Sequence, residues 1–349
     1  MSDNQRPPVY YSEYLQLDKI LSAQAPESTK EGIVANDEML FIVIHQTYEL
    51  WFKQVLHELN LVRGIFKSQK IEDNTADLYD SVNKLKRICS ILEILVQQIS
   101  VLETMTALDF LDFRDLLRPA SGFQSIQFKT LEALLGLQFQ ERHGKEYYTS
   151  QLCPRDVQHV KDKEADESLF SLVNKWLERM PFVTDASYWQ GIEDDGSGTP
   201  IFLQAYKKVY DQSLQEGEKA QSAVFESLFI NPSNYPEGRK LSQTASANAL
   251  FIMLYRDFPR LQLPFQLLDT LLEIDGLMGL WRYRHIHMVR RTIGKRVGTG
   301  GSTGADYLRQ AAESHYIFKE ISELTSFLMA RHELPKLPTS LQATLSYNI

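Results

Sequence analysis

The sequence predicts an all-α fold, and three observations support this class. Apolar residues recur with the period of a helix along most of the 349 residues. No strand-like alternation of useful length appears. Gly and Pro, at 17 and 13 residues, are too few for a turn-rich β architecture. The pattern predicts helices at about 36–67, 75–106, 109–117, 123–136, 165–180, 200–229, 242–256, 264–293 and 304–330.

These helices are expected to form one large domain of long packed helices, because no segment between them reads as a linker. The expected parts are an N-terminal segment at 1–35, a core at 36–136 and 240–335, a more polar helical insertion at 137–239 and a C-terminal tail at 336–349. The N-terminal segment carries Tyr11 and Tyr14 but is too short to bury them alone. We therefore expect it to dock, either on the body of the protein or on a second subunit.

Composition excludes several classes of function. A formal net charge of -8 disfavours a nucleic-acid partner, which would require a basic face. No apolar run is long enough for a membrane span, and the first residues lack a charged-then-apolar leader, so a soluble protein without a secretory signal is expected. Cys89 and Cys153 are the only cysteines and form no CxxCH motif, which predicts a reducing cytoplasm and excludes covalently attached haem.

Two histidines lie on the apolar stripes of long predicted helices. His45 falls between Phe41 and Tyr48 on the stripe of the first, and His285 falls four residues after Trp281 on the stripe of another. One inward histidine on each of two helices suits the two faces of a planar cofactor, and haem would take one of them as its axial ligand. The alternative is a pair of core histidines whose ring nitrogens are satisfied by backbone or water.

Other metal sites lack their motifs. A di-iron bundle needs Glu-x-x-His on two helices, and no such pair is present. HExxH is absent, and two cysteines cannot build a cysteine-rich zinc site.

Arg114 falls on the apolar face of the short predicted helix at 109–117, four residues after Phe110. A buried guanidinium needs an anionic partner, because an uncompensated buried charge is strongly destabilising. One candidate is a neighbouring carboxylate, from Asp109, Asp112 or Asp115. The other is the carboxylate of a substrate, which the planar guanidinium can hold through two hydrogen bonds.

Two further segments are candidates for contact with a ligand. In residues 119–125, Ser121 or Gly122 is either a helix N-cap or a source of hydroxyl and backbone N–H groups for a pocket. The glycine-rich segment 298–304 matches neither GxGxxG nor the P-loop pattern and follows a helix, so a nucleotide site is not expected. It suits a mobile loop over a small polar ligand, or a simple connector.

Several stretches closely resemble the tryptophan 2,3-dioxygenase family. They are residues 11–19 (YSEYLQLDK), 41–53 (FIVIHQTYELWFK), 102–110 (LETMTALDF), 113–115 (FRD), 119–125 (PASGFQS), 281–285 (WRYRH) and 298–304 (GTGGSTG). The similarity is strong over about 37–135 and 242–335 and weak over about 137–240. Motifs of this length in this order are far more specific than the two histidine stripes.

The resemblance implies a haem b enzyme that opens the indole ring of L-tryptophan with O2, giving N-formyl-L-kynurenine in the first step of tryptophan catabolism. By the same resemblance, His285 is the iron ligand with Trp281 beside the haem, and His45 hydrogen-bonds the indole N–H. The remaining implied roles are walls of the indole pocket for Phe41, Tyr48 and Phe110, a carboxylate clamp for Arg114, an ammonium or carboxylate contact for Thr299 and a place at the haem edge for Ser121 and Gly122.

The family also implies a homotetramer in which the N-terminal segment, with Tyr11 and Tyr14, enters a neighbour's site. Three alternatives remain open at this stage. One is a haem enzyme of the same superfamily that inserts a single oxygen into a tryptophan-like indole, the second is a non-catalytic haem sensor, and the third is a colourless helical scaffold.

Overall fold

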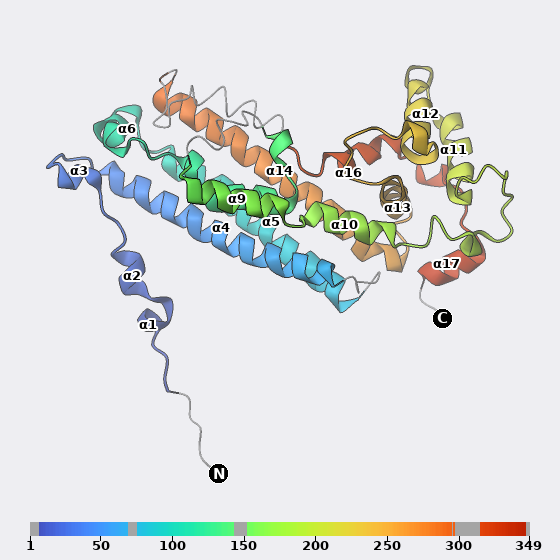
Figure 1. Ribbon diagram of the computed structural model, residues 1–349, viewed down its shortest axis with the longest axis horizontal. Helices are drawn as coiled ribbons and strands as arrows, with labels where there is room; N and C mark the ends of the chain where they lie inside the picture. Colours follow the sequence, from blue (N-terminus) through green and yellow to red (C-terminus); the bar gives the residue numbers. More distant parts are fainter. Residues whose placement is uncertain (1–6, 69–74, 143–151, 295, 297–314, 347–349) are drawn as a thin grey trace, which may run out of the picture.

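The computed structural model describes residues 7–68, 75–142, 152–294, 296 and 315–346, and every regular element within these ranges is a helix. The predicted all-α class is therefore confirmed. The three longest helices are α4 (Asp37–Lys67), α5 (Ala76–Leu102) and α14 (Pro259–Ile293). Helix α5 packs along both α4 and α14, and the three run side by side along the molecule (Figure 1).

Hydroxyl side chains begin many of the helices. Each accepts a hydrogen bond from a backbone N–H of the first turn, which has no partner inside the helix. Caps of this kind are Thr75 for α5, Thr106 for α6 (Ala107–Arg114), Ser125 for α7 (Ile126–Leu135), Ser168 for α10 (Leu169–Glu178) and Ser242 for α13 (Gln243–Leu254). Helix α5 ends at Leu102, before the predicted end at 106, and α6 starts after Thr106 in a new direction.

The core lies on the predicted stripes. Val55, Leu59 and Val62 of α4 are fully buried at steps of four and three. Burial of one such side chain contributes about 1.5–3 kcal/mol, so a face of this length holds the helix against its neighbours. Helix α13 is buried on all sides from Ala245 to Leu254. It packs against α10, whose Trp176 is also buried, so α10 contributes to the same core although it lies within 137–239.

Helix boundaries differ from the sequence prediction in several places. Helix α14 begins at Pro259 and continues through Pro264, because the loss of one backbone hydrogen bond is outweighed by packing of its long apolar face. The predicted helix 200–229 is divided into α11 (Ile201–Ser213) and α12 (Ala220–Phe225). Helix α9 (Pro154–Ala165) was not predicted, because its sequence is polar and only Val160 is buried.

The predicted helix 304–330 also differs. Residues 304–314 lie outside the described residues. The remainder contains only α16 (Lys319–Glu323) and a short 3-10 helix (Leu324–Phe327). The chain then ends its described part with a 3-10 turn (Arg331–Glu333) and α17 (Thr339–Leu345).

The N-terminal segment extends away from the body. Its helices α1 (Tyr11–Leu15) and α2 (Leu17–Leu21) bury no residue, and Figure 1 shows them projecting from the end of α4 that carries α3 (Glu27–Lys30). Tyr11 and Tyr14 are each 75% exposed. The part of the segment that carries these tyrosines is thus not buried against the body, whereas Glu27 and Ser28 further along donate backbone hydrogen bonds to Glu38 of α4. Docking of the tyrosines on a second subunit stays a prediction.

Among the described residues no single helix is both long and apolar enough to cross a membrane. Helix α5 and residues 107–117 taken together would be long and apolar enough, but the two parts are bent by 91° at the break between them.

Asp275 of α14 is a buried carboxylate that accepts hydrogen bonds from the backbone N–H groups of Ile317 and Phe318. Burial raises its pKa to about 6, against an ordinary value near 3.8. The folded state therefore binds this proton more tightly than the unfolded state does. As pH rises from about 4 to above 6, the free energy of unfolding should fall by about 3 kcal/mol through this group and then level off.

The variant Asp275→Asn should lack this component. Urea denaturation at a series of pH values would measure it as the difference in stability between the two proteins. Between about pH 4 and pH 6.5 the wild-type protein should lose stability relative to the variant. A difference that stays constant over this interval would show that Asp275 is not the titrating group.

Candidate functional site

His45 is presented by α4 as a neutral hydrogen-bond acceptor. Its Nδ1 lies 2.7 Å from the carbonyl oxygen of Phe41, one turn earlier. A carbonyl can only accept, so Nδ1 carries the proton and Nε2 of the neutral ring keeps its lone pair. Burial lowers the pKa of His45, which keeps the ring in this neutral form. The ring can therefore accept a hydrogen bond at Nε2 from a donor such as an N–H group.

His285 is presented by α14 as a second neutral imidazole. Burial, and to a smaller extent the proximity of His45, lowers its pKa to about 4. Its Nδ1 is buried and makes no hydrogen bond with any described residue, nor does Nε1 of Trp281. The Trp281 ring stacks on the His285 ring at 5.1 Å and 13°, because residues four apart lie on one face of a helix. His287, two residues further along the helix, is exposed.

A cluster of phenylalanine rings adjoins His45 through Phe41. The Phe41 ring lies 4.1 Å from the His45 ring, 5.7 Å from Phe110 and 5.6 Å from Phe113. Phe41 comes from α4, whereas Phe110 and Phe113 come from α6, so the two helices build one apolar wall. This wall suits a flat aromatic ligand. The structure thus brings together three residues predicted from sequence for the site, namely Phe41, His45 and Phe110.

Tyr48 lies in different surroundings. Its ring contacts Phe52 at 6.1 Å and Trp281 at 6.2 Å, and the ring contacts described for the Phe41 cluster do not include it. Its hydroxyl donates to the carbonyl of Leu95 on α5 at 2.8 Å, and burial raises its pKa to about 12. Tyr48 therefore connects α4 to α5 beside the Trp281 side of the site.

Arg114 is buried at the end of α6, with 5% of its surface exposed. Its Nη1 lies 3.8 Å from Oδ1 of Asp115, which is longer than a hydrogen bond. The Asp115 side chain is 77% exposed and lies closer to Arg118, at 3.2 Å. Asp109 is engaged with the hydroxyl and backbone N–H of Thr106. Of the neighbouring carboxylates, the structure thus places that of Asp115 nearest to the Arg114 guanidinium, as an ion pair at a distance longer than a hydrogen bond.

Ser121 and Gly122 form the turn before α7. The Ser121 hydroxyl accepts from the N–H of Phe123 as an N-cap, as one of its two predicted roles requires. A Cβ atom added to Gly122 would meet nothing within 4 Å, so this backbone borders open space. Thr299 and the rest of the glycine-rich segment lie outside the described residues.

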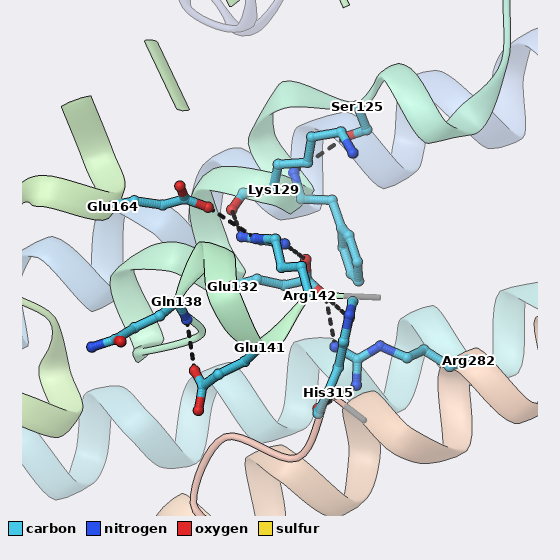
Figure 2. A network of polar contacts seen from close by, with 10 residues as sticks. Ser125, Lys129, Glu132, Gln138, Glu141, Arg142, Glu164, Arg282 and His315 are labelled. Carbon is cyan, nitrogen blue, oxygen red and sulfur yellow. Dashed lines mark hydrogen bonds and ion pairs between the residues drawn. The ribbon is translucent and has the colours of Figure 1, made fainter. Parts of the chain in front are cut away.

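A buried polar network next to Trp281 was not anticipated from sequence. Glu132 of α7 accepts from Arg282 of α14 at 2.7 Å and from Arg142 at 2.5 Å (Figure 2). His315 Nδ1 lies 3.3 Å from the same carboxylate. In the sequence these residues are recognisable only as charged residues next to apolar positions, and this does not indicate which of them bond to each other. Their pairing depends on contacts 10, 150 and 183 residues apart along the chain.

The donor set of the site fits a haem better than a free metal ion. No three His, Cys, Asp or Glu side chains cluster to hold a metal ion among the residues the structure describes. What α14 offers instead is a single buried neutral imidazole, held against an indole ring. A haem iron takes this one donor from the protein on its proximal side. The Nδ1 of His285 has no hydrogen-bond partner among the described residues, whereas the ring nitrogens of a core histidine usually have one.

An all-α bundle that presents two neutral imidazoles from different helices, one beside Phe41 and the other beside Trp281, is typical of helical proteins that hold a cofactor through histidine. A family model described as tryptophan 2,3-dioxygenase matches residues 2–328. The chain belongs to the tryptophan 2,3-dioxygenase family. The match also runs through residues 137–239, where the motifs alone gave little similarity.

Relatives from distant organisms agree over nearly the whole chain. A tryptophan 2,3-dioxygenase of Alteromonas mediterranea is 42% identical over 97% of this chain and 98% of its own length. One from Xenopus tropicalis is also 42% identical, over 96% of this chain and 86% of its own. One from Bdellovibrio bacteriovorus is 39% identical, over 98% and 99% of the two chains.

Proposed function

We propose that this chain opens the indole ring of L-tryptophan with O2 to give N-formyl-L-kynurenine, using a haem b held by His285. The observation that carries the proposal is the pair of partly buried neutral histidines, one with Nε2 available as an acceptor and one without a hydrogen bond at Nδ1 to any described residue. The family and its relatives support the substrates and the reaction. When bound, the haem supplies a ferrous iron that binds and activates O2.

His285 would hold the cofactor as the ligand of its iron. A metal ligand must be deprotonated, and burial keeps this imidazole neutral down to about pH 4. The stacked Trp281 ring fixes the plane of the imidazole. Ser121 and the open backbone at Gly122 border the edge of the cofactor in this proposal.

His45 orients the substrate. Its Nε2 accepts the hydrogen bond of the indole N–H, while Nδ1 stays bonded to the Phe41 carbonyl. Phe41 and Phe110 pack against the indole faces and exclude water. Arg114 pairs with the carboxylate of tryptophan, so the amino-acid end and the indole end are recognised by different helices. Thr299 contacts the ammonium or carboxylate end.

Tyr48 is proposed as a pocket wall on the side of Trp281. The exposed Tyr11 and Tyr14, together with the projecting N-terminal segment, support assembly in which this segment enters a neighbour's site in a homotetramer. We place the assembled enzyme in the cytoplasm.

The haem-loaded, reduced protein mixed with L-tryptophan and air tests the reaction directly. We expect the near-ultraviolet absorbance of N-formyl-L-kynurenine to appear while tryptophan is consumed. A Soret band that shifts on addition of tryptophan, without consumption of it, would indicate a haem sensor. A protein that stays colourless after incubation with haem would indicate a helical scaffold. Either result would contradict the proposed function.

A further inference from the structure

Helices α7 and α14 meet through two side-chain contacts that lie next to each other. Phe128 and Glu132 are four residues apart, so both point from one face of α7. The Phe128 ring lies 5.1 Å from the Trp281 ring, and Glu132 accepts a hydrogen bond from Arg282 at 2.7 Å. The partners on α14 are consecutive residues, so the two contacts together fix the rotation of this part of α14 relative to α7.

The Glu132 carboxylate lies at the centre of a buried network of polar side chains. The side chains of Glu132, Arg142, Arg282 and His315 are 4%, 1%, 6% and 7% exposed. Arg282 also donates to the backbone carbonyl of His315 at 3.0 Å. Figure 2 shows these side chains converging on the Glu132 carboxylate from α7, from α14 and from the segments that carry Arg142 and His315.

The ionised form of Glu132 persists because its partners outweigh its burial. Burial alone would raise the pKa of this carboxyl group, but Arg142, His315 and Arg282 together hold it well below the usual range. Arg142 is itself held by Glu164 of α9 at 2.9 Å. The network is therefore a fixed, multiply bonded anchor and not a single ion pair that solvent could open.

Trp281 depends on this anchor for its orientation. Its Nε1 makes no hydrogen bond with a described residue, so ring packing and the direction of α14 decide where the indole lies. The indole in turn stacks at 13° on the imidazole of His285. Contacts therefore lead from the Glu132 network through the Trp281 indole to the His285 imidazole.

We propose that Glu132 is a positioning residue for the site, acting through Arg282 and the Phe128–Trp281 contact to fix the plane of the His285 imidazole. The proposal rests on the function proposed above, in which His285 holds the haem. Groups that orient a metal-bound histidine usually affect metal affinity or activity by about 10–100-fold when they are replaced.

Fluorine NMR of haem-free protein containing 5-fluorotryptophan tests the proposal without any activity measurement. The chain has 4 tryptophans, and the variant Trp281→Phe assigns the line of Trp281 by its disappearance. In Glu132→Gln, which keeps the shape but removes the charge, we expect the Trp281 line to move by more than its own width. Arg282→Met should move the same line and leaves Glu132 paired with Arg142, so it decides the question if Glu132→Gln does not fold.

Arg63→Met is the matched control. Arg63 is also a buried arginine, 5% exposed at its side chain and bonded to Asp166 at 2.8 Å, but it lies near the other end of α4. Its loss should lower stability and leave the Trp281 line in place. Any line it does move should be that of Trp176, whose ring lies 5.9 Å from Phe66.

The haem-loaded variants give the second measurement. For Glu132→Gln and Arg282→Met we expect a shift of the iron–histidine stretching band in the resonance Raman spectrum of the reduced protein, and about a tenfold loss of haem affinity or turnover. A Trp281 line and an iron–histidine band that stay at their wild-type positions in both variants would overturn the proposal. Failure of the wild-type protein to bind haem through His285 would instead overturn the proposed function, so the two failures are distinguishable.

Discussion

Replacing His285 with alanine is expected to abolish stable haem binding. In the proposed site this imidazole is the only protein donor to the iron, and it is already neutral and buried, so nothing else on α14 can take its place. The Soret absorbance of the purified variant, measured after incubation with haem and removal of the excess, should fall to the level of non-specific binding. Catalysis should be lost with it.

His287→Ala is the control for this experiment. His287 lies two residues further along α14, on the exposed side, and its loss should leave haem content unchanged. Retention of a full Soret band by His285→Ala would remove His285 from the role of iron ligand. The roles proposed for Trp281 and His45 would then have to be reassigned, because both assume a haem held by His285.

Replacing Arg114 with alanine is expected to weaken tryptophan binding about a hundredfold and to leave haem content intact. Loss of one partner from a buried, hydrogen-bonded charge pair costs about 2–5 kcal/mol, and each 1.4 kcal/mol is a factor of ten in affinity. The tryptophan-induced change in the Soret band measures the dissociation constant. Tryptamine, which lacks the carboxylate, should bind the variant and the wild-type protein with similar affinity.

Arg118→Ala provides the comparison. Arg118 is half exposed, four residues further along, and pairs with the same Asp115 at 3.2 Å. Its loss should alter tryptophan affinity little, since exposed ion pairs contribute about 0–1 kcal/mol. Equal affinity of Arg114→Ala and wild-type protein for tryptophan would show that the guanidinium serves only the fold.

Periodicity was sufficient to predict the parts of the fold that rest on local pattern. The apolar stripe of α4 placed His45 inward between Phe41 and Tyr48, and the stripe of α14 separated His285 from the exposed His287. These predictions succeeded because both helices are long and bury one continuous face. The Phe41–Phe110 wall required in addition that α6 fold back against α4, which the motifs of the family implied but periodicity did not.

Features set by tertiary contacts could not be predicted in this way. The continuation of α14 through Pro264 violates a local rule that packing overrides. Tyr48 falls on the predicted stripe, but only the path of α5 and α14 determines that it contacts Trp281. The Glu132 network joins residues that are distant in sequence, and a charged residue carries no local sign of its partner. Roles that depend on such contacts are seen only once the helices are placed.

In the proposed function, the two partly buried histidines serve a haem reaction that adds both atoms of O2 to tryptophan. Mass spectrometry of the product formed under oxygen gas labelled with oxygen-18 counts the atoms of O2 that are added. We expect the product to contain two labelled oxygen atoms and to match N-formyl-L-kynurenine in retention time. A product with a single labelled oxygen, on an otherwise intact indole, would contradict the account and assign the chain to single-oxygen insertion.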